Sequence, residues 1–86
     1  MFDRVIVHPR VNAKRPEITE DDVATAWKNA FVIQRRNSDS TECYAAAGID
    51  SKSRILEMIG VEREDGTIIV IHAMKLTNKM RAELGL

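Results

Sequence analysis

The sequence predicts an α+β fold: a small, mostly antiparallel sheet with two N-terminal helices and one C-terminal helix. Three observations favour this class. Short apolar runs rich in β-branched residues recur along the chain and are separated by turn signals. Helix-start signals occur twice near the N-terminus and once near the C-terminus. Most predicted strands follow one another directly, which favours antiparallel pairing with the helices packed on one side of the sheet.

The first strand and the first helix are predicted near the N-terminus. The run RVIV, residues 4–7, is short, apolar and β-branched, which is typical of a strand. Pro9 suits the first position of a helix, where its missing N–H costs no hydrogen bond. Pro16 disfavours helical geometry at Arg15, so this helix is expected over residues 9–15.

The segment ITEDDVATAWKNAF, residues 18–31, carries the strongest helix-start signal in the chain. Thr19 is a natural N-cap, and Asp22 three positions later gives a near match to a capping box. Acidic side chains at a helix start interact favourably with the helix dipole, so this acidic cluster has a structural explanation. The apolar residues that follow have helical spacing and form one face: Val23, Ala26, Trp27, Ala30 and Phe31.

Three or four strands and a helix are predicted for the rest of the chain. Strands are expected, in order, at residues 31–36, 42–49, 54–62 and 67–74. The alanines of the second segment have low strand propensity, which leaves the number at three or four. The polar segments NSDST, DSKS and REDG separate these strands as a loop and two turns.

The end of the chain combines a buried strand with a short helix. Four consecutive apolar residues at 68–71 are typical of a central strand that is covered on both faces. Thr77 is a natural cap for a final helix over residues 78–84, whose Met80 and Leu84 face inward. The predicted order is therefore β-α-α-β-β-β-α, with a fourth strand possible before the last helix.

Size and composition limit the possible functions. The 86 residues are expected to form a single domain, 1–86, and 13 basic residues balance 13 acidic ones. This zero net charge argues against a nucleic-acid binder that relies on bulk positive charge. No apolar run approaches the roughly 20 residues of a membrane span, and the N-terminal segment lacks the pattern of a signal peptide, so no membrane association is expected.

Cysteine and histidine content indicates the compartment and argues against a metal. One cysteine, Cys43, excludes an internal disulfide and fits a reducing, cytoplasmic location. His8 and His72 are far apart and form no recognisable zinc-binding spacing with Cys43. The sequence therefore predicts no metal and no cofactor, and it indicates no oligomeric state.

Three segments, HPRVNAKRPEITEDDVATAW, ECYAAAGIDSKSRILEMIGV and GTIIVIHAMKLTNKMRAEL, together cover nearly the whole chain. In pattern and order they resemble the opening helices, the central hairpin, and the closing strand and helix of the RelE-like superfamily of small bacterial toxins, especially the BrnT-type proteins. The resemblance implies a cleft between the sheet and its helices. It also implies a metal-independent endoribonuclease of a type II toxin–antitoxin pair, with an antitoxin protein as partner and RNA or the ribosome as target.

Cleavage of RNA without a metal needs proton transfer and a stabilised phosphate. Histidine transfers protons near neutral pH, and lysine and arginine stabilise phosphate charge. The resemblance implies three catalytic residues, which are His72, Arg54 and Lys75. It implies an RNA-binding surface formed by His8, Arg10, Lys14, Arg15, Lys79 and Arg81. Relatives often carry arginine where this chain has Met74 and glycine where it has Ser53.

Structural roles stay open for several of these residues. By strand alternation His72 shares a face with Ile68, Val70 and Met74, so it is a buried, hydrogen-bonded histidine if that face forms the core. His8 alternatively serves only as a cap for the first helix.

Two alternative functions stay open as well. The basic residues of the first helix, Arg10, Lys14 and Arg15, alternatively form an ordinary solvated face. The second hypothesis is a non-catalytic member of the same fold that binds RNA or a protein partner, which Met74 in place of the relatives' arginine favours. A third reading is a small oligomerising interaction domain.

Overall fold

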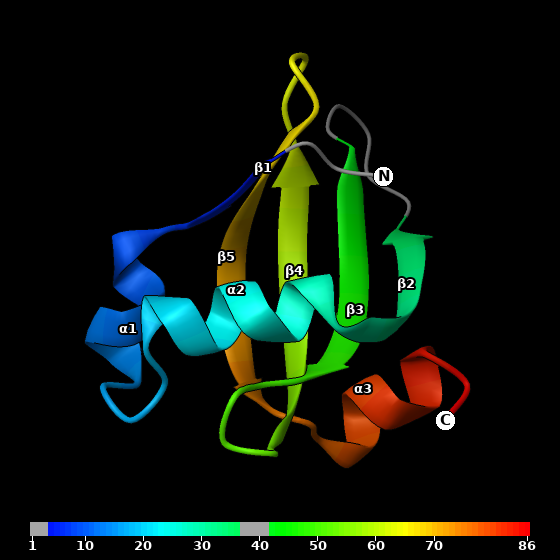
Figure 1. Ribbon diagram of the computed structural model, residues 1–86. Helices are drawn as coiled ribbons and strands as arrows, with labels where there is room; N and C mark the ends of the chain where they lie inside the picture. Colours follow the sequence, from blue (N-terminus) through cyan, green and yellow to red (C-terminus); the bar gives the residue numbers. More distant parts are fainter. Residues whose placement is uncertain (1–3, 37–41) are drawn as a thin grey trace.

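The computed structural model describes residues 4–36 and 42–86. Its elements are, in order, β1 (Arg4–Val7), α1 (Pro9–Lys14), α2 (Glu20–Lys28), β2 (Ala30–Arg36), β3 (Cys43–Ile49), β4 (Ile55–Glu62), β5 (Thr67–Lys75) and α3 (Asn78–Glu83) (Figure 1). The α+β class is confirmed, and four strands rather than three follow the two N-terminal helices. The loop predicted at residues 37–41 lies outside the described residues.

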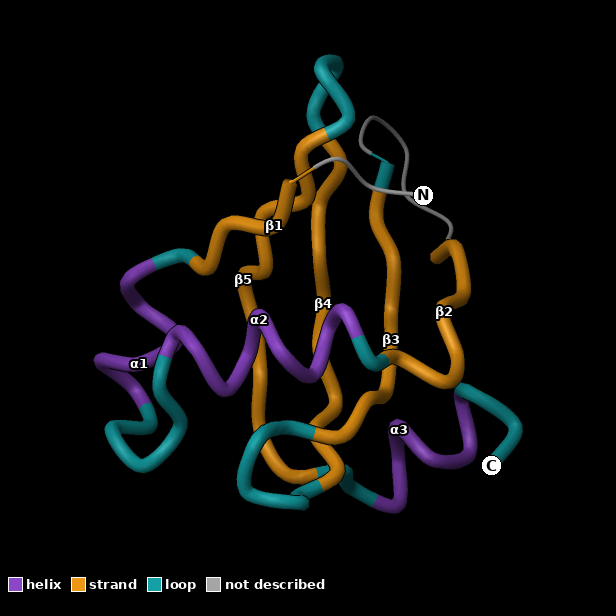
Figure 2. The backbone as a smooth tube through the Cα atoms, in the orientation of Figure 1, coloured by secondary structure: helices purple, strands orange, loops and turns teal. Residues whose placement is uncertain are grey.

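The five strands form one sheet in the order β1-β5-β4-β3-β2. Neighbouring strands from β2 to β5 are antiparallel, whereas β1 pairs in parallel with β5. The prediction of a mostly antiparallel sheet with a central last strand is therefore confirmed. β1 pairs only with residues 67–70 of β5, so α1 rather than a strand flanks the remaining part of β5 (Figure 2).

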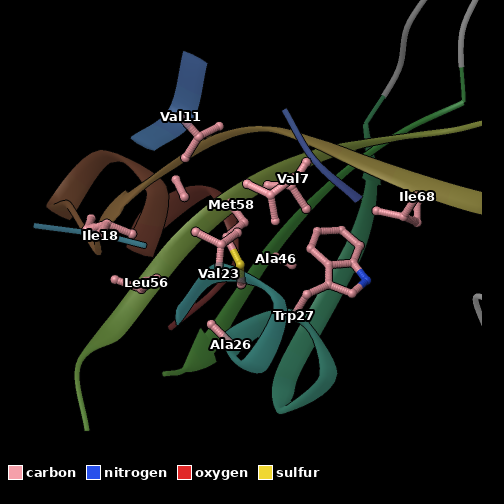
Figure 3. Close-up of a cluster of buried hydrophobic side chains, with 12 residues drawn as sticks. Val7, Val11, Ile18, Val23, Ala26, Trp27, Ala46, Leu56, Met58 and Ile68 are labelled. Carbon is pink, nitrogen blue, oxygen red and sulfur yellow. The ribbon is translucent and has the colours of Figure 1, made fainter. Parts of the chain in front are cut away.

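The two faces of the sheet carry separate hydrophobic clusters. On the face covered by α1 and α2, here called the α2 face, the buried cluster is Val7, Val11, Ile18, Val23, Ala26, Trp27, Ala46, Leu56, Met58, Ile68, Val70 and Ala73 (Figure 3). On the opposite face, here called the α3 face, Met80 and Leu84 pack against Ala45 and Ala47. The expectation that all helices pack on one side is therefore wrong. Alternation along β3 points Ala45 and Ala47 away from Ala46, and their small side chains leave room for α3.

The ends of α1 and α3 follow the local signals in the sequence. His8 is the N-cap of α1, and its Nδ1 accepts a hydrogen bond from the Arg10 N–H at 3.2 Å. Thr77 is the N-cap of α3, and its Oγ1 accepts from the Met80 N–H at 3.2 Å. Both caps satisfy N–H groups that have no partner inside their helix.

The start of α2 is as predicted, but its end is not. Thr19 and Asp22 form a complete capping box, with N···O distances of 3.1 and 3.0 Å. The helix then ends at Lys28 rather than continuing to residue 31. Phe31 belongs to β2 and is 51% exposed, so it does not extend the apolar face of the helix. The pairing of β2 with β3 takes over from helical hydrogen bonding at this point, and strand geometry turns the Phe31 side chain outward.

One glycine allows the close approach of α2 to the sheet. A Cβ atom added at Gly48 of β3 would lie 1.9 Å from the carbonyl oxygen of Ala26 in α2. The backbone of α2 therefore passes directly over β3 only because this position has no side chain.

A register shift in β5 decides which face carries His72. Ile59 pairs with His72, but the preceding pair joins Gly60 to Val70, so Ile71 is an extra residue in β5. Val70 remains in the α2-face cluster, whereas His72 lies opposite Ile59 on the α3 face. The expectation that His72 shares a face with Ile68 and Val70 is wrong, because one inserted residue reverses the alternation.

Candidate functional site

His72 forms a hydrogen bond with a buried carboxylate on the neighbouring strand. The His72 Nε2 atom lies 2.9 Å from Oε2 of Glu57, whose side chain is 6% exposed. The other carboxylate oxygen, Oε1, accepts from the Thr77 backbone N–H at 2.9 Å and from the Thr77 hydroxyl at 2.6 Å. Three elements therefore meet at Glu57: β4 provides the carboxylate, β5 the imidazole and the N-cap of α3 the hydroxyl.

These contacts keep Glu57 ionised. Burial raises the pKa of Glu57, but hydrogen bonds from Thr77 and His72 outweigh burial and lower the pKa below its ordinary value. An ionised carboxylate only accepts hydrogen bonds, so the His72 Nε2 carries a proton. His72 is hydrogen-bonded, but it lies on the α3 face with a side chain that is 27% exposed, so it is not the buried core histidine that the structural alternative expected.

A pocket of about 550 Å³ lies between α1 and β5. It is lined by Arg10, Val11, Ala13, Lys14, Arg15, Ile71, His72 and Ala73. Three of these residues are permanently basic and none is acidic. The pocket exists because β1 ends at Val7, so that α1 takes the place of a strand beside this half of β5. We call it the α1–β5 pocket.

Two of the basic side chains of the α1–β5 pocket, Arg10 and Arg15, contact β5 rather than a carboxylate. The Arg10 Nε donates to the Ile71 carbonyl at 3.3 Å, and the Arg15 Nη2 donates to the Met74 sulfur at 3.5 Å. Lys14 is exposed in the last turn of α1. Within residues 4–36 and 42–86, none of these three cations forms an ion pair. Their positive charge is therefore available to an anion that enters the pocket.

Arg54 lies elsewhere, beside the start of α2. Its Nε donates to Asp50 Oδ2 at 2.7 Å, and its Nη2 donates to Asp22 Oδ2 at 3.0 Å. Lys52 also donates to Asp22, at 2.6 Å. These four residues form what we call the Asp22 cluster. Arg54 does not line the α1–β5 pocket, so the structure does not bring it to His72.

Both carboxylates of the Asp22 cluster are ionised and buried. Their side chains are 2% exposed at Asp22 and 0% exposed at Asp50. Burial raises the pKa of Asp22, but hydrogen bonds from Lys52, Thr19 and Ser51 hold that pKa far below its ordinary value. Burial likewise raises the pKa of Asp50, and hydrogen bonds from Arg54 and Lys52 lower it below its ordinary value.

The remaining predicted site residues do not line the pocket. Lys75 is exposed at the end of β5, and Lys79 and Arg81 are exposed on α3. His8 caps α1, as the structural alternative for this residue expected. The structure therefore places Arg10, Lys14, Arg15 and His72 of the predicted set around the pocket, whereas the other predicted site residues do not line it.

Glu57 is the site residue that the sequence analysis missed. The available signal is its place in ILEMIGV, where it is the single charged residue of an otherwise apolar strand segment. A buried carboxylate is costly unless it is hydrogen-bonded, so a charge at such a position requires a partner. Sequence alone does not say that the partners are His72 and Thr77.

No group of three or more histidine, cysteine, aspartate or glutamate side chains in the described part of the chain lies close enough to hold a metal ion. No helix among the described residues has the length and apolar character that crossing a bilayer requires.

Comparison with known proteins yields no relative. No protein-family model, no curated protein and no solved structure gives a significant match to the chain. The fold and site define the chain only as a small α+β domain with a cationic pocket beside a histidine–carboxylate pair.

Proposed function

We propose that this protein binds RNA and cleaves it without a metal ion. Arg10, Lys14 and Arg15 hold the phosphate, and His72 transfers the proton. One observation carries this proposal: three cations without carboxylate partners and a histidine that is hydrogen-bonded to a carboxylate line the same pocket. The resemblance to RelE-like toxins supports the same activity, and it adds a cytoplasmic location and an antitoxin partner that covers the pocket.

The proposed chemistry is an intramolecular attack on the phosphate. The 2′-hydroxyl loses its proton to His72, and its oxygen forms a new bond to phosphorus. The bond from phosphorus to the 5′ oxygen breaks, which leaves a 2′,3′-cyclic phosphate, and water supplies the proton that the 5′ oxygen takes up. Negative charge develops on the other phosphate oxygens, where cations such as Arg10 and Lys14 stabilise it. Arg54 has no part in this reaction, because two carboxylates already neutralise it.

A second candidate is RNA binding without cleavage. Cleavage requires one proton to be removed and another to be added. Among the residues that line the pocket, His72 is the single histidine, and none is a carboxylate or a thiol. This observation favours a module that holds RNA through phosphate contacts and does not cut it.

The first test uses purified protein and labelled single-stranded RNA in the presence of a metal chelator. Cleavage is expected with the native protein, and the products should end in a 2′,3′-cyclic phosphate. His72→Ala is expected to lose roughly 10²–10⁴-fold in rate, the usual contribution of a general acid or base, while it retains RNA affinity. Lys28→Ala, which removes an exposed charge at the end of α2, is the control and should cleave at the native rate.

The possible outcomes separate the candidates. Binding without cleavage by the native protein would support the second candidate and reject the first. Absence of both binding and cleavage would reject both candidates. Equal cleavage by the native protein and by a normally folded His72→Ala variant would remove His72 from the chemistry.

A further inference from the structure

We propose that Glu57 is a positioning residue for His72. It holds the imidazole proton on Nε2 and leaves Nδ1 as the nitrogen that exchanges a proton with RNA. The assignment of the tautomer stands on the geometry alone, whereas the use of Nδ1 rests on the proposed ribonuclease function.

The orientation of the Glu57 carboxylate is fixed at both oxygens. Oε1 accepts two hydrogen bonds from Thr77, at 2.9 and 2.6 Å, while Oε2 faces the His72 Nε2 at 2.9 Å. The Thr77 hydroxyl itself accepts from the Met80 N–H at 3.2 Å, so its own proton is free to point at Glu57. A rotation of the carboxylate would break all three contacts of a buried charge, which is costly.

This arrangement determines the state of His72. A carboxylate offers no proton, so Nε2 must be the donor in the contact with Glu57. Within residues 4–36 and 42–86, Nδ1 of His72 has no hydrogen-bond partner. His72 also lines the α1–β5 pocket together with Arg10 and Lys14. In the neutral imidazole, Nδ1 then carries the lone pair, and under the proposed function it is the nitrogen that takes the proton of the 2′-hydroxyl.

Replacing Glu57 by glutamine should reverse the tautomer. Both donors of Thr77 point at the position of Oε1, so the glutamine carbonyl oxygen must occupy that side. The glutamine NH₂ group then takes the position of Oε2 and faces the His72 Nε2. Because an amide NH₂ only donates, Nε2 must become the acceptor and the imidazole proton must move to Nδ1.

The experiment is nitrogen NMR of the two histidine side chains, at a pH at which both rings are neutral. The native protein is expected to show the Nε2–H tautomer at His72, and Glu57→Gln is expected to show Nδ1–H. His8 is an internal reference, because its Nδ1 accepts from the Arg10 N–H and fixes the Nε2–H tautomer in both proteins. A native His72 with its proton on Nδ1, or a Glu57→Gln protein whose His72 keeps Nε2–H, would overturn the proposal.

A matched variant covers the case in which Glu57→Gln does not fold. Thr77→Val removes the hydroxyl donor to Oε1 but leaves the carboxylate beside His72. It should therefore keep the Nε2–H tautomer, although loss of the α3 cap lowers stability. Appearance of the Nδ1–H tautomer in Thr77→Val would contradict the assignment to Glu57.

Kinetics separate this inference from the proposed function. Glu57→Gln is expected to reduce kcat about 100-fold or more with little change in KM, because the wrong nitrogen faces the substrate. If the native protein cleaves no RNA, the proposed function fails while the tautomer result still tests the geometry. If the tautomer reverses and kcat stays at the native value, the positioning role fails while the ribonuclease function stands.

Discussion

The Asp22 cluster and the α1–β5 pocket both gather positive charge, but only the first contains carboxylates. In the Asp22 cluster, Arg54 and Lys52 donate to two buried aspartates. In the α1–β5 pocket, the cations contact a carbonyl oxygen, a sulfur atom or solvent instead. Arginine and lysine therefore connect a loop to a helix through ion pairs in the Asp22 cluster, whereas they leave net positive charge in the α1–β5 pocket.

This difference indicates which basic residues are candidates for binding an RNA phosphate. An arginine that already pairs with two carboxylates has little remaining charge for an RNA phosphate. The resemblance to RelE-like toxins predicts a catalytic Arg54, whereas its hydrogen bonds to Asp50 and Asp22 favour a structural role. Cations without carboxylate partners are the better candidates for binding an anion. The predictions below test this contrast, first through stability, where the largest effect is expected, and then through RNA binding.

Removing the central carboxylate should break the Asp22 cluster. Asp22→Ala leaves Arg54 without one of its two partners and removes half of the capping box of α2. The free energy of unfolding is expected to fall by about 3–5 kcal/mol, the usual cost of removing one partner of a buried ion pair. Urea titration measures this loss, and Asp21→Ala in the same helical turn is the exposed control. Equal losses in the two variants would show that the cluster is not a stabilising unit.

Acid should weaken the same cluster by a smaller amount. The pKa values of the two aspartates of the cluster, Asp22 and Asp50, are lowered in the folded protein, and so is that of Glu57 outside the cluster. Groups with a depressed folded-state pKa stabilise the protein fully above their unfolded pKa, near 4, and lose that contribution as pH falls towards the folded value. The free energy of unfolding should therefore decline below about pH 4. The free energy of unfolding of Asp22→Asn should decline less steeply with falling pH than that of the native protein. Parallel pH curves for these two proteins would contradict the assignment of the acid sensitivity to Asp22.

Removing the cations of the pocket should affect RNA binding rather than stability. The triple variant with Arg10, Lys14 and Arg15 replaced by alanine is expected to lose less than about 1 kcal/mol of stability, because no ion pair is broken. The logarithm of the RNA association constant falls linearly with the logarithm of the salt concentration. If each of the three cations contacts one phosphate, the magnitude of this slope should be smaller by about 2 in the triple variant, at about 0.7 per contact for single strands.

Arg54→Ala provides the opposite pattern. This variant should lose stability through the Asp22 cluster, and its folded fraction should keep the native salt dependence of RNA binding. Fluorescence anisotropy over a series of salt concentrations measures both variants. A loss of salt dependence in Arg54→Ala alone would reverse the roles that we assign to the two regions.

Sequence patterns predicted most elements and helix ends because these depend on residues a few positions apart. Thr19 and Asp22 are three positions apart in one helical turn, and they form the predicted capping box. Pro9 and Pro16 bracket α1 through their own backbone restrictions. The end of α2 was missed because pairing of β2 with β3 competes with helical spacing at Phe31.

The candidate site was only partly predictable for a related reason. Arg10 and Lys14 lie one helical turn apart and Arg15 is the C-cap of the same short helix, so the sequence already grouped them. Whether such cations find carboxylates depends on distant segments, as with Arg54 and Asp22, which are 32 positions apart. Charge in a sequence therefore identifies candidates, and only the folded chain separates those that are neutralised from those that are available.

The sequence by itself determined the strands, the helices with their caps, and the mostly antiparallel order of this chain. These follow from local backbone preferences and from the alternation of apolar residues. Only the tertiary structure decided that α3 covers the second face and that Ile71 shifts the register of β5. That shift turns His72 towards Glu57, because strand pairing across the sheet, rather than alternation along one strand, sets the direction of a side chain beyond a bulge.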